Sequence, residues 1–188
     1  MTKLKVILGS TREGRQGEKV FSWMKKFLKQ YKGFETEFLD LKDWPLKFYS
    51  FPVSPAYGKI DDPLVKKWTA KIADADAFVI ITPEYNHSFP AVLKNALDHV
   101  YHEWNNKPVA FMSYSVGPIA GSRAVEQLRQ IVIELQMAPI REQLSIPMVQ
   151  DAFDSENNPT SDQLDGRASA MFKQLEWWAN TLKAGRKN

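Results

Sequence analysis

Residues 77–82 read Ala-Phe-Val-Ile-Ile-Thr, a continuous apolar run with no charged side chain. Such a run is typical of a strand that is covered on both faces in a parallel sheet. The polar turn Pro83-Glu84-Tyr85-Asn86 follows it, and Pro90 then opens a helix at its favoured first position. Similar runs indicate further strands, and we expect five in all, the others being 3–9, 34–40, 108–113 and, with a weaker pattern, 138–146.

The stretches between these runs have helical spacing. Apolar residues recur every three or four positions, as expected for one buried face of a helix, in the segments 20–31, 65–72, 93–100, 125–135 and 164–178. Strand and helix therefore alternate, which favours right-handed crossovers and a parallel sheet with helices on both faces. We predict an α/β three-layer sandwich with the flavodoxin-like strand order 2-1-3-4-5.

The length of 188 residues and the hydrophobic content of 44% match a single domain over residues 1–188. Two irregular stretches, 43–59 and 150–160, interrupt the alternation without resembling linkers between domains. The first is long for a connection and rich in aromatic residues. We expect it to form a lid or a subunit contact, with packing into the core as the alternative.

Composition narrows the possible chemistry. The chain has no cysteine, so any redox reaction must come from a bound cofactor or metal. The formal charge of +3 is spread along the chain, which argues against a nucleic-acid partner and suits a small anionic ligand. No run is long enough to cross a membrane and the first residues lack a signal-peptide pattern, so we expect a cytoplasmic protein without a membrane partner.

The turn after the first strand has the residue types of a phosphate site. Residues 9–18 read Gly-Ser-Thr-Arg-Glu-Gly-Arg-Gln-Gly-Glu and lead into a helix. A helix N-terminus offers free N–H groups, hydroxyls and arginines add donors, and glycines allow close approach. The spacing fits neither GxGxxG nor GxxxxGK[ST], which leaves a phosphate monoester such as that of FMN. Alternatively, Ser10 or Thr11 only caps the helix. Arg12 and Arg15 are then merely solvated.

The turn after the third strand can serve a flat ring. In the predicted strand order, ligands bind beyond the ends of strands one and three, where this turn meets the first loop. An isoalloxazine ring needs a flat slot with amide donors and acceptors at one edge. Asn86 can bond that edge, Tyr85 can flank the ring, and Glu84 can orient the loop. The alternative for each is a turn residue that is satisfied locally.

Two other kinds of site have weak support. His99 and His102 are one helical turn apart with Glu103 beside them, but no HExxH motif is present and we expect no metal site. A hydrolase is also disfavoured, because no GxSxG turn follows any strand and the three histidines have no evident nucleophile.

The two turns, 9–18 and 83–90, and the segments that follow them resemble a known family, the NADPH-dependent FMN reductases, which includes quinone, azo-dye and chromate reductases. The resemblance spans roughly residues 3–146. Its most specific part is Pro83-Glu84-Tyr85-Asn86 followed by Ser88, Pro90 and Leu93-Lys94-Asn95-Ala96-Leu97-Asp98; its looser parts are Gly9-Ser10-Thr11-Arg12 and 107–117.

The resemblance implies three groups of FMN-binding residues. The phosphate would be held by Ser10, Thr11, Arg12, Arg15, Gly17 and Glu18, and the isoalloxazine would be lined by Pro83, Glu84, Tyr85 and Asn86. The ring or the ribityl chain would contact Ser113, Tyr114, Ser115 and Gly117. Ser115 and the segment 117–121 depart from the more glycine-rich pattern of the family.

The resemblance also implies an enzyme in which FMN takes a hydride from NADPH or NADH and reduces a small acceptor, such as a quinone, a free flavin or an azo compound, by a ping-pong mechanism. No catalytic side chain is required, and a homodimer or homotetramer is expected. The main alternative is an electron carrier or redox sensor that acts through protein contacts, although the charge of +3 contrasts with acidic flavodoxins. A nucleotide-phosphate-binding module without redox activity would account only for the first loop.

Overall fold

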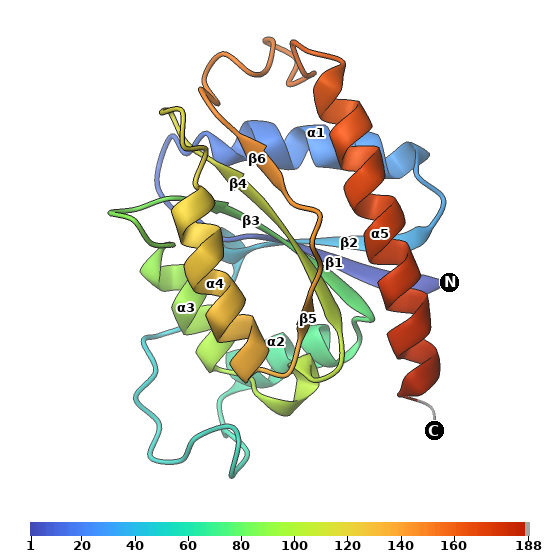
Figure 1. Ribbon diagram of the computed structural model, residues 1–188. Helices are drawn as coiled ribbons and strands as arrows, with labels where there is room; N and C mark the ends of the chain where they lie inside the picture. The colour runs from blue at the N-terminus through green and yellow to red at the C-terminus, as the bar shows by residue number, and fades with distance from the viewer. Residues whose placement is uncertain (187–188) are drawn as a thin grey trace.

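A parallel sheet runs through the centre of the computed structural model, which describes residues 1–186 (Figure 1). Its strand order is β2-β1-β3-β4-β5, with β6 also paired to β4. This order confirms the predicted flavodoxin-like arrangement. The strands are β1 (Thr2–Leu8), β2 (Phe34–Asp40), β3 (Ala77–Pro83), β4 (Pro108–Tyr114), β5 (Ala138–Pro139) and β6 (Leu144–Ile146).

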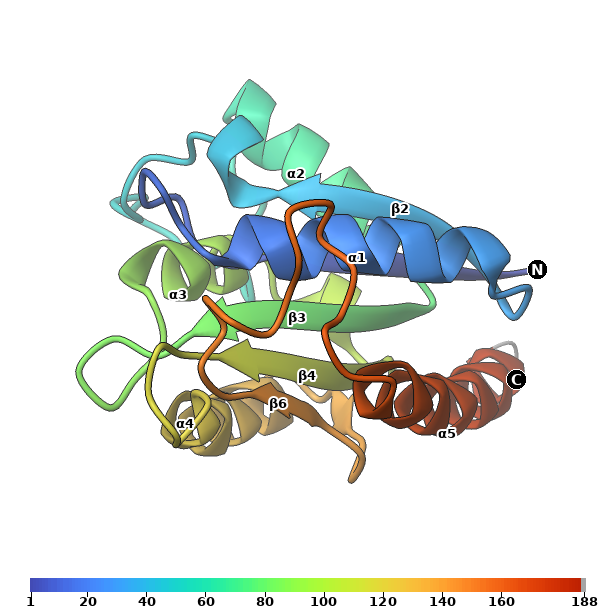
Figure 2. The same cartoon turned by 90° about the horizontal axis from the view of Figure 1, so that it is seen from above.

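Helices cover both faces of the sheet (Figure 2). One face carries α1 (Gly17–Gln30) and α5 (Gln163–Gly185), and the other carries α2 (Pro63–Ala73), α3 (Ala91–Asp98) and α4 (Ser122–Glu134). Each face has its own apolar core because alternate residues of a strand point to opposite sides: Leu4, Val6 and Leu8 of β1 belong to one core, and Ile7 belongs to the other. None of the helices within residues 1–186 combines the length and apolar character needed to cross a bilayer.

The register of the central strands aligns their carboxyl ends. Leu8 of β1 pairs with Ile81 of β3, and Pro83 pairs with Tyr114 at the end of β4. The loops that follow these three strands therefore leave the sheet at one edge.

The fifth strand is shorter than expected. The sequence predicts one strand over 138–146, but only residues 138–139 and 144–146 pair with β4. Pro139 has no N–H to donate to a ladder. The Ile140 N–H still donates to the Val109 carbonyl of β4 at 3.0 Å, but the rest of the segment between the two pieces bonds to side chains. Arg129 donates to the carbonyl of Ile140 at 3.1 Å, and the Glu142 N–H donates to Gln174 at 2.8 Å.

The aromatic stretch 43–59 divides between the core and the surface. Trp44 packs on the buried Trp68 with ring centroids 5.1 Å apart. Phe48 and Tyr57 are 77% and 90% exposed. Core packing therefore accounts for the beginning of this stretch, whereas the lid or subunit contact stays a prediction for the exposed rings. Two short 3₁₀ turns, η1 (Leu41–Asp43) and η2 (His102–Trp104), complete the fold.

Candidate functional site

Three loops meet at the carboxyl edge of the sheet, as Figure 2 shows. They connect β1 to α1 (residues 9–16), β3 to α3 (84–90) and β4 to α4 (115–121). This is the switch point of the sheet, where β1 and β3 carry their following helices on opposite faces. Open α/β sheets bind ligands at such a point. The structure therefore brings together the loops that the sequence singles out.

The first loop leaves the sheet close against β3. The Gly9 N–H donates to the Ile81 carbonyl at 2.8 Å. A Cβ on Gly9 would lie 2.9 Å from Leu93 and 3.1 Å from that carbonyl oxygen, so a larger residue would push the loop outward. Within residues 1–186, the N–H groups of residues 11–16 find no protein acceptor. Free donors at the start of α1 form the type of site that holds an anion.

The helix-cap interpretation of Ser10 and Thr11 does not describe this loop. The residue that caps α1 is Gln16, and it makes no side-chain cap bond. Ser10 is 1% exposed, and its hydroxyl is hydrogen-bonded to the Tyr85 hydroxyl of the second loop at 3.1 Å. Its hydroxyl therefore joins the two loops instead of closing a helix.

The two arginines of the first loop differ in environment. Arg15 is buried, and its guanidinium donates to Asp40 at 2.8 Å and to the Ser10 carbonyl. It thus braces the loop against the end of β2, and its contact with a phosphate stays a prediction. Arg12 is exposed and has no partner in the described part of the chain, so it is the arginine available to an anion.

Around the start of α1, several polar atoms are buried without a hydrogen-bond partner among residues 1–186. They include the Tyr114 hydroxyl and the side-chain oxygen of Gln16. Burial raises the pKa of Tyr114 well above its usual value. A Cβ on Gly17 would overlap the Tyr114 ring, so glycine is required for this close approach. Buried polar atoms without partners are costly, and their grouping beside free N–H groups fits a polar ligand at this edge.

The second loop forms a tight hairpin. Tyr85 and Ser88 exchange backbone hydrogen bonds of 2.7 and 2.9 Å. Between them, Asn86 and His87 have φ angles of 49° and 69°, the left-handed conformation that this kind of turn requires. The side chain of Asn86 is exposed at the tip. Tyr85, at 36% exposed, stands between the tip and Ser10.

Helix α4 holds this hairpin in place. Arg123 donates to the carboxylate of Glu84 at 2.6 Å, and Gln127 donates to the His87 carbonyl at 2.9 Å while accepting from Ser88. The Glu84 side chain is 7% exposed, and its second oxygen is buried without a partner. The sequence analysis did not single out Arg123 or Gln127, the two residues of α4 that hold the hairpin. Their spacing of four residues, which places them on one face of a helix, was the available signal.

The third loop is shaped by its own hydrogen bonds. Ser113 is buried and its hydroxyl lies 3.3 Å from that of Ser145 in β6, so it faces the edge of the sheet. Ser115 donates to the Gly117 carbonyl at 2.9 Å. Val116 and Ile119 are 64% and 47% exposed. The third loop thus exposes two apolar side chains to solvent.

Each of the two histidines considered for a metal site bonds a backbone carbonyl. His99 is 1% exposed and bonds the Asn95 carbonyl at 2.7 Å, whereas His102 is exposed and bonds the Ala56 carbonyl at 3.0 Å. Residues 1–186 hold no group of three potential ligands of a metal ion.

The strand order and the helices on both faces of the sheet define a flavodoxin-like fold. Residues 2–151 match the family of NADPH-dependent FMN reductases. The chain is 41% identical over 150 residues to an NAD(P)H-dependent FMN reductase of Schizosaccharomyces pombe, which covers 77% of this chain and 74% of that protein. The chain belongs to the NADPH-dependent FMN reductase family.

Further relatives agree with this assignment. An NAD(P)H:quinone oxidoreductase of Solanum tuberosum is 29% identical over 188 residues, covering 96% of this chain and 94% of that protein. The solved structure of FerB, a flavoenzyme NAD(P)H:(acceptor) oxidoreductase from Paracoccus denitrificans, shares the fold with a TM-score of 0.78 at 24% identity, over 94% of this chain and 98% of that one. The chain is thus an FMN-dependent oxidoreductase that uses NAD(P)H, which confirms the predicted enzyme class and cofactors.

Proposed function

We propose that this enzyme holds FMN at the edge formed by the three loops and that NAD(P)H and a small acceptor use the open side of that site in turn. When bound, FMN supplies the chemistry by accepting a hydride from the nicotinamide and passing electrons to the acceptor. The observation that carries the proposal is the row of N–H groups at residues 11–16, beside Arg12, none of which has a protein partner within residues 1–186. No side chain is needed as an acid or base.

The first loop would bind the phosphate. Its N–H groups, the Thr11 hydroxyl and Arg12 are the donors on offer, and the N-terminal end of α1 adds a partial positive charge. Arg15 would act indirectly, by fixing the course of the loop through Asp40. Glu18 is drawn toward Arg15 at 3.3 Å, so its carboxylate is turned to that brace.

The second and third loops would orient the ring. The hairpin is rigid, because Arg123 and Gln127 hold it from α4 and the Tyr85 hydroxyl holds it to Ser10. Pro83 to Asn86 would line the isoalloxazine, and the exposed amide of Asn86 can bond its polar edge. The Tyr114 hydroxyl and the Ser115–Gly117 turn would face the ribityl chain or the ring.

A quinone or a free flavin is the acceptor that the relatives favour. The relative from Solanum tuberosum is named as a quinone oxidoreductase, and several others are named as FMN reductases. Exposed apolar residues beside the site, Val116 and Ile119, suit a flat and largely apolar acceptor. They would equally suit a second copy of the chain, and we propose a homodimer or homotetramer in the cytoplasm. Analytical ultracentrifugation tests the assembly.

The role of Arg12 can be tested by substitution. Arg12→Ala should weaken FMN binding by about 1.5–3 kcal/mol, the range for a hydrogen bond to a charged group. Arg141→Ala is the matched control, because this arginine is 86% exposed and, within residues 1–186, pairs with Glu142 alone. FMN affinity is measured by titrating the apoprotein and following flavin fluorescence. Equal affinity in wild type and Arg12→Ala would remove Arg12 from the site.

A further inference from the structure

Helix α4 contacts the hairpin 85–88 through one side chain that bonds two successive residues. The Gln127 amide donates to the His87 carbonyl at 2.9 Å and accepts from the Ser88 hydroxyl at 2.5 Å. A carbonyl can only accept a hydrogen bond, so the NH2 group of the amide faces His87 and its oxygen faces Ser88. Gln127 therefore holds both the backbone and a side chain of the turn just after Asn86.

The conformation of this turn needs support from outside. Asn86 and His87 are consecutive residues in the left-handed region, with φ angles of 49° and 69°. Residues other than glycine adopt this conformation at a cost, and it persists where the surrounding structure fixes it. Two backbone hydrogen bonds between Tyr85 and Ser88 close the turn, and Gln127 adds a bond to the carbonyl of the second left-handed residue. The backbone at Asn86 thus depends on α4 as well as on the turn.

Helix α4 is a firm base for this contact. It starts directly after the third loop, where Gly121 has a φ angle of 78°. A Cβ at Gly121 would lie 3.0 Å from the side chain of Ser113 and 3.1 Å from the carbonyl oxygen of Tyr114, so the start of the helix packs closely on the end of β4. The helix therefore links the hairpin of the second loop to the strand end from which the third loop leaves.

We propose that Gln127 is a positioning residue for the flavin. The inference rests on the proposed function, in which the amide of Asn86 bonds the polar edge of the isoalloxazine. By holding His87 and Ser88, Gln127 fixes the backbone that follows Asn86 and so sets the direction in which the Asn86 amide is presented. Gln127 is exposed on α4, so its loss should disturb the turn without opening the core.

A double-mutant cycle for FMN affinity tests this role. Asn86→Ala removes the bond to the ring and should weaken FMN binding about fivefold. Gln127→Met keeps the length of the side chain without its hydrogen bonds and should weaken binding by a similar factor. Because Gln127 acts through Asn86, the double variant should also bind about fivefold more weakly than the wild type, whereas independent effects would multiply to about 25-fold. A 25-fold loss, or wild-type affinity in either single variant, would overturn the proposal.

The midpoint potential of the bound FMN is a readout that a merely structural residue would not move. Hydrogen bonds to the ring tune its redox chemistry. Asn86→Ala and Gln127→Met should therefore shift the potential in the same direction, and the double variant should shift it no further. Gln130→Met is the matched control, because Gln130 is exposed on the same helix and, within residues 1–186, makes no bond to the hairpin. Shifts of opposite sign, or an equal shift in Gln130→Met, would overturn the proposal.

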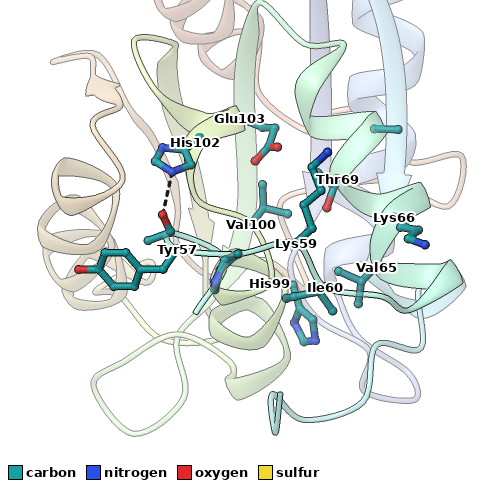
Figure 3. Close-up of a pocket in the computed structure, with 14 residues that line it drawn as sticks. Tyr57, Lys59, Ile60, Val65, Lys66, Thr69, His99, Val100, His102 and Glu103 are labelled. Atoms are coloured by element: carbon teal, nitrogen blue, oxygen red, sulfur yellow. Dashed lines mark hydrogen bonds between the residues drawn. The ribbon is translucent and has the colours of Figure 1, made fainter. Parts of the chain in front are cut away.

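A cleft elsewhere in the molecule provides a control for the place of FMN. It lies between α2 and the segment that follows α3 (Figure 3), and its volume is about 550 Å³. None of its lining residues belongs to 9–17, 83–89 or 113–121. Ala70 lines it from an exposed position on α2, so Ala70→Trp should fill the cleft and leave FMN affinity unchanged. Loss of FMN binding in Ala70→Trp would place the flavin in this cleft, away from Asn86, and would overturn the proposal.

The outcomes separate this inference from the proposed function. A wild-type chain that binds no FMN would contradict both. A chain whose FMN affinity falls in Arg12→Ala but not in Gln127→Met would keep the proposed function and overturn only the positioning role. Ser88→Ala is a second variant that leaves α4 untouched: it removes one of the two bonds to Gln127 and should give a smaller loss of affinity, and an unchanged affinity together with an unchanged potential would count against the proposal.

Discussion

Tyr114→Phe should have opposite effects on the free protein and on its complex with FMN. The Tyr114 hydroxyl is buried at the end of β4 against the backbone of Gly17 at the start of α1, and within residues 1–186 it makes no hydrogen bond of good geometry. A buried hydroxyl without a partner costs about 1–3 kcal/mol, and the ring itself stays in place in the substitution. We therefore expect the apoprotein to gain about 1 kcal/mol of unfolding free energy. If the hydroxyl bonds FMN, the affinity should fall by about 1 kcal/mol, or roughly fivefold.

Tyr31→Phe is the matched control for this prediction. Tyr31 lies just after the C-terminal end of α1, and its hydroxyl donates to Glu176 at 2.7 Å. Tyr31→Phe therefore removes a hydroxyl whose hydrogen bond is satisfied. Urea unfolding of the apoprotein should show destabilisation by about 1 kcal/mol, with FMN affinity unchanged. The reasoning would be refuted if Tyr114→Phe destabilised the apoprotein as Tyr31→Phe does, or if it left FMN affinity at the wild-type value.

Two further predictions concern charged residues. Arg15→Ala should destabilise the apoprotein by about 3 kcal/mol in urea unfolding, because the substitution leaves a cavity and removes the ion-pair partner of Asp40. A variant that is stable but has lost FMN affinity would instead make Arg15 a phosphate ligand. Burial lowers the pKa of Lys107 to about 8, below its value of 10.5 in the unfolded chain. Between pH 8 and 10.5 the unfolded state therefore binds more protons than the folded state. The buried charge lowers the unfolding free energy by its full amount below pH 8, and this loss shrinks as the pH rises toward 10.5. The stability of Lys107→Met relative to wild type should therefore fall by about 2 kcal/mol between pH 7 and 9.5, and a pH-independent difference would contradict the shifted pKa.

Much of the fold could be predicted because its signals are local. Each central strand is an apolar run and each helix has a regular apolar face, so the alternation and the strand order follow from the sequence. The break in the strand predicted over 138–146 could not be predicted. Its middle residues bond to Arg129, 11 residues before Ile140, and to Gln174, 32 residues after Glu142, and neither side chain carries a local mark of that role.

The sequence predicts which loops form the site, but not which residues contact one another within it. Periodicity and strand order bring residues 9–17 and 83–89 to one edge, as the structure has them. The partner of Arg15 is Asp40, and the partner of Ser10 is Tyr85, 75 residues away. Such pairs depend on the packing of whole elements, so sequence alone gave Arg12 and Arg15 the same role although only one of them is free.

Anaerobic reduction tests the central claim most directly. The chain is reconstituted with FMN and its visible flavin absorbance is followed as NADPH or NADH is added without oxygen, after which a benzoquinone is supplied. An enzyme of the proposed kind bleaches with at least one nucleotide and recovers its absorbance with the quinone. Bound flavin whose absorbance stays unchanged with both nucleotides would contradict the account.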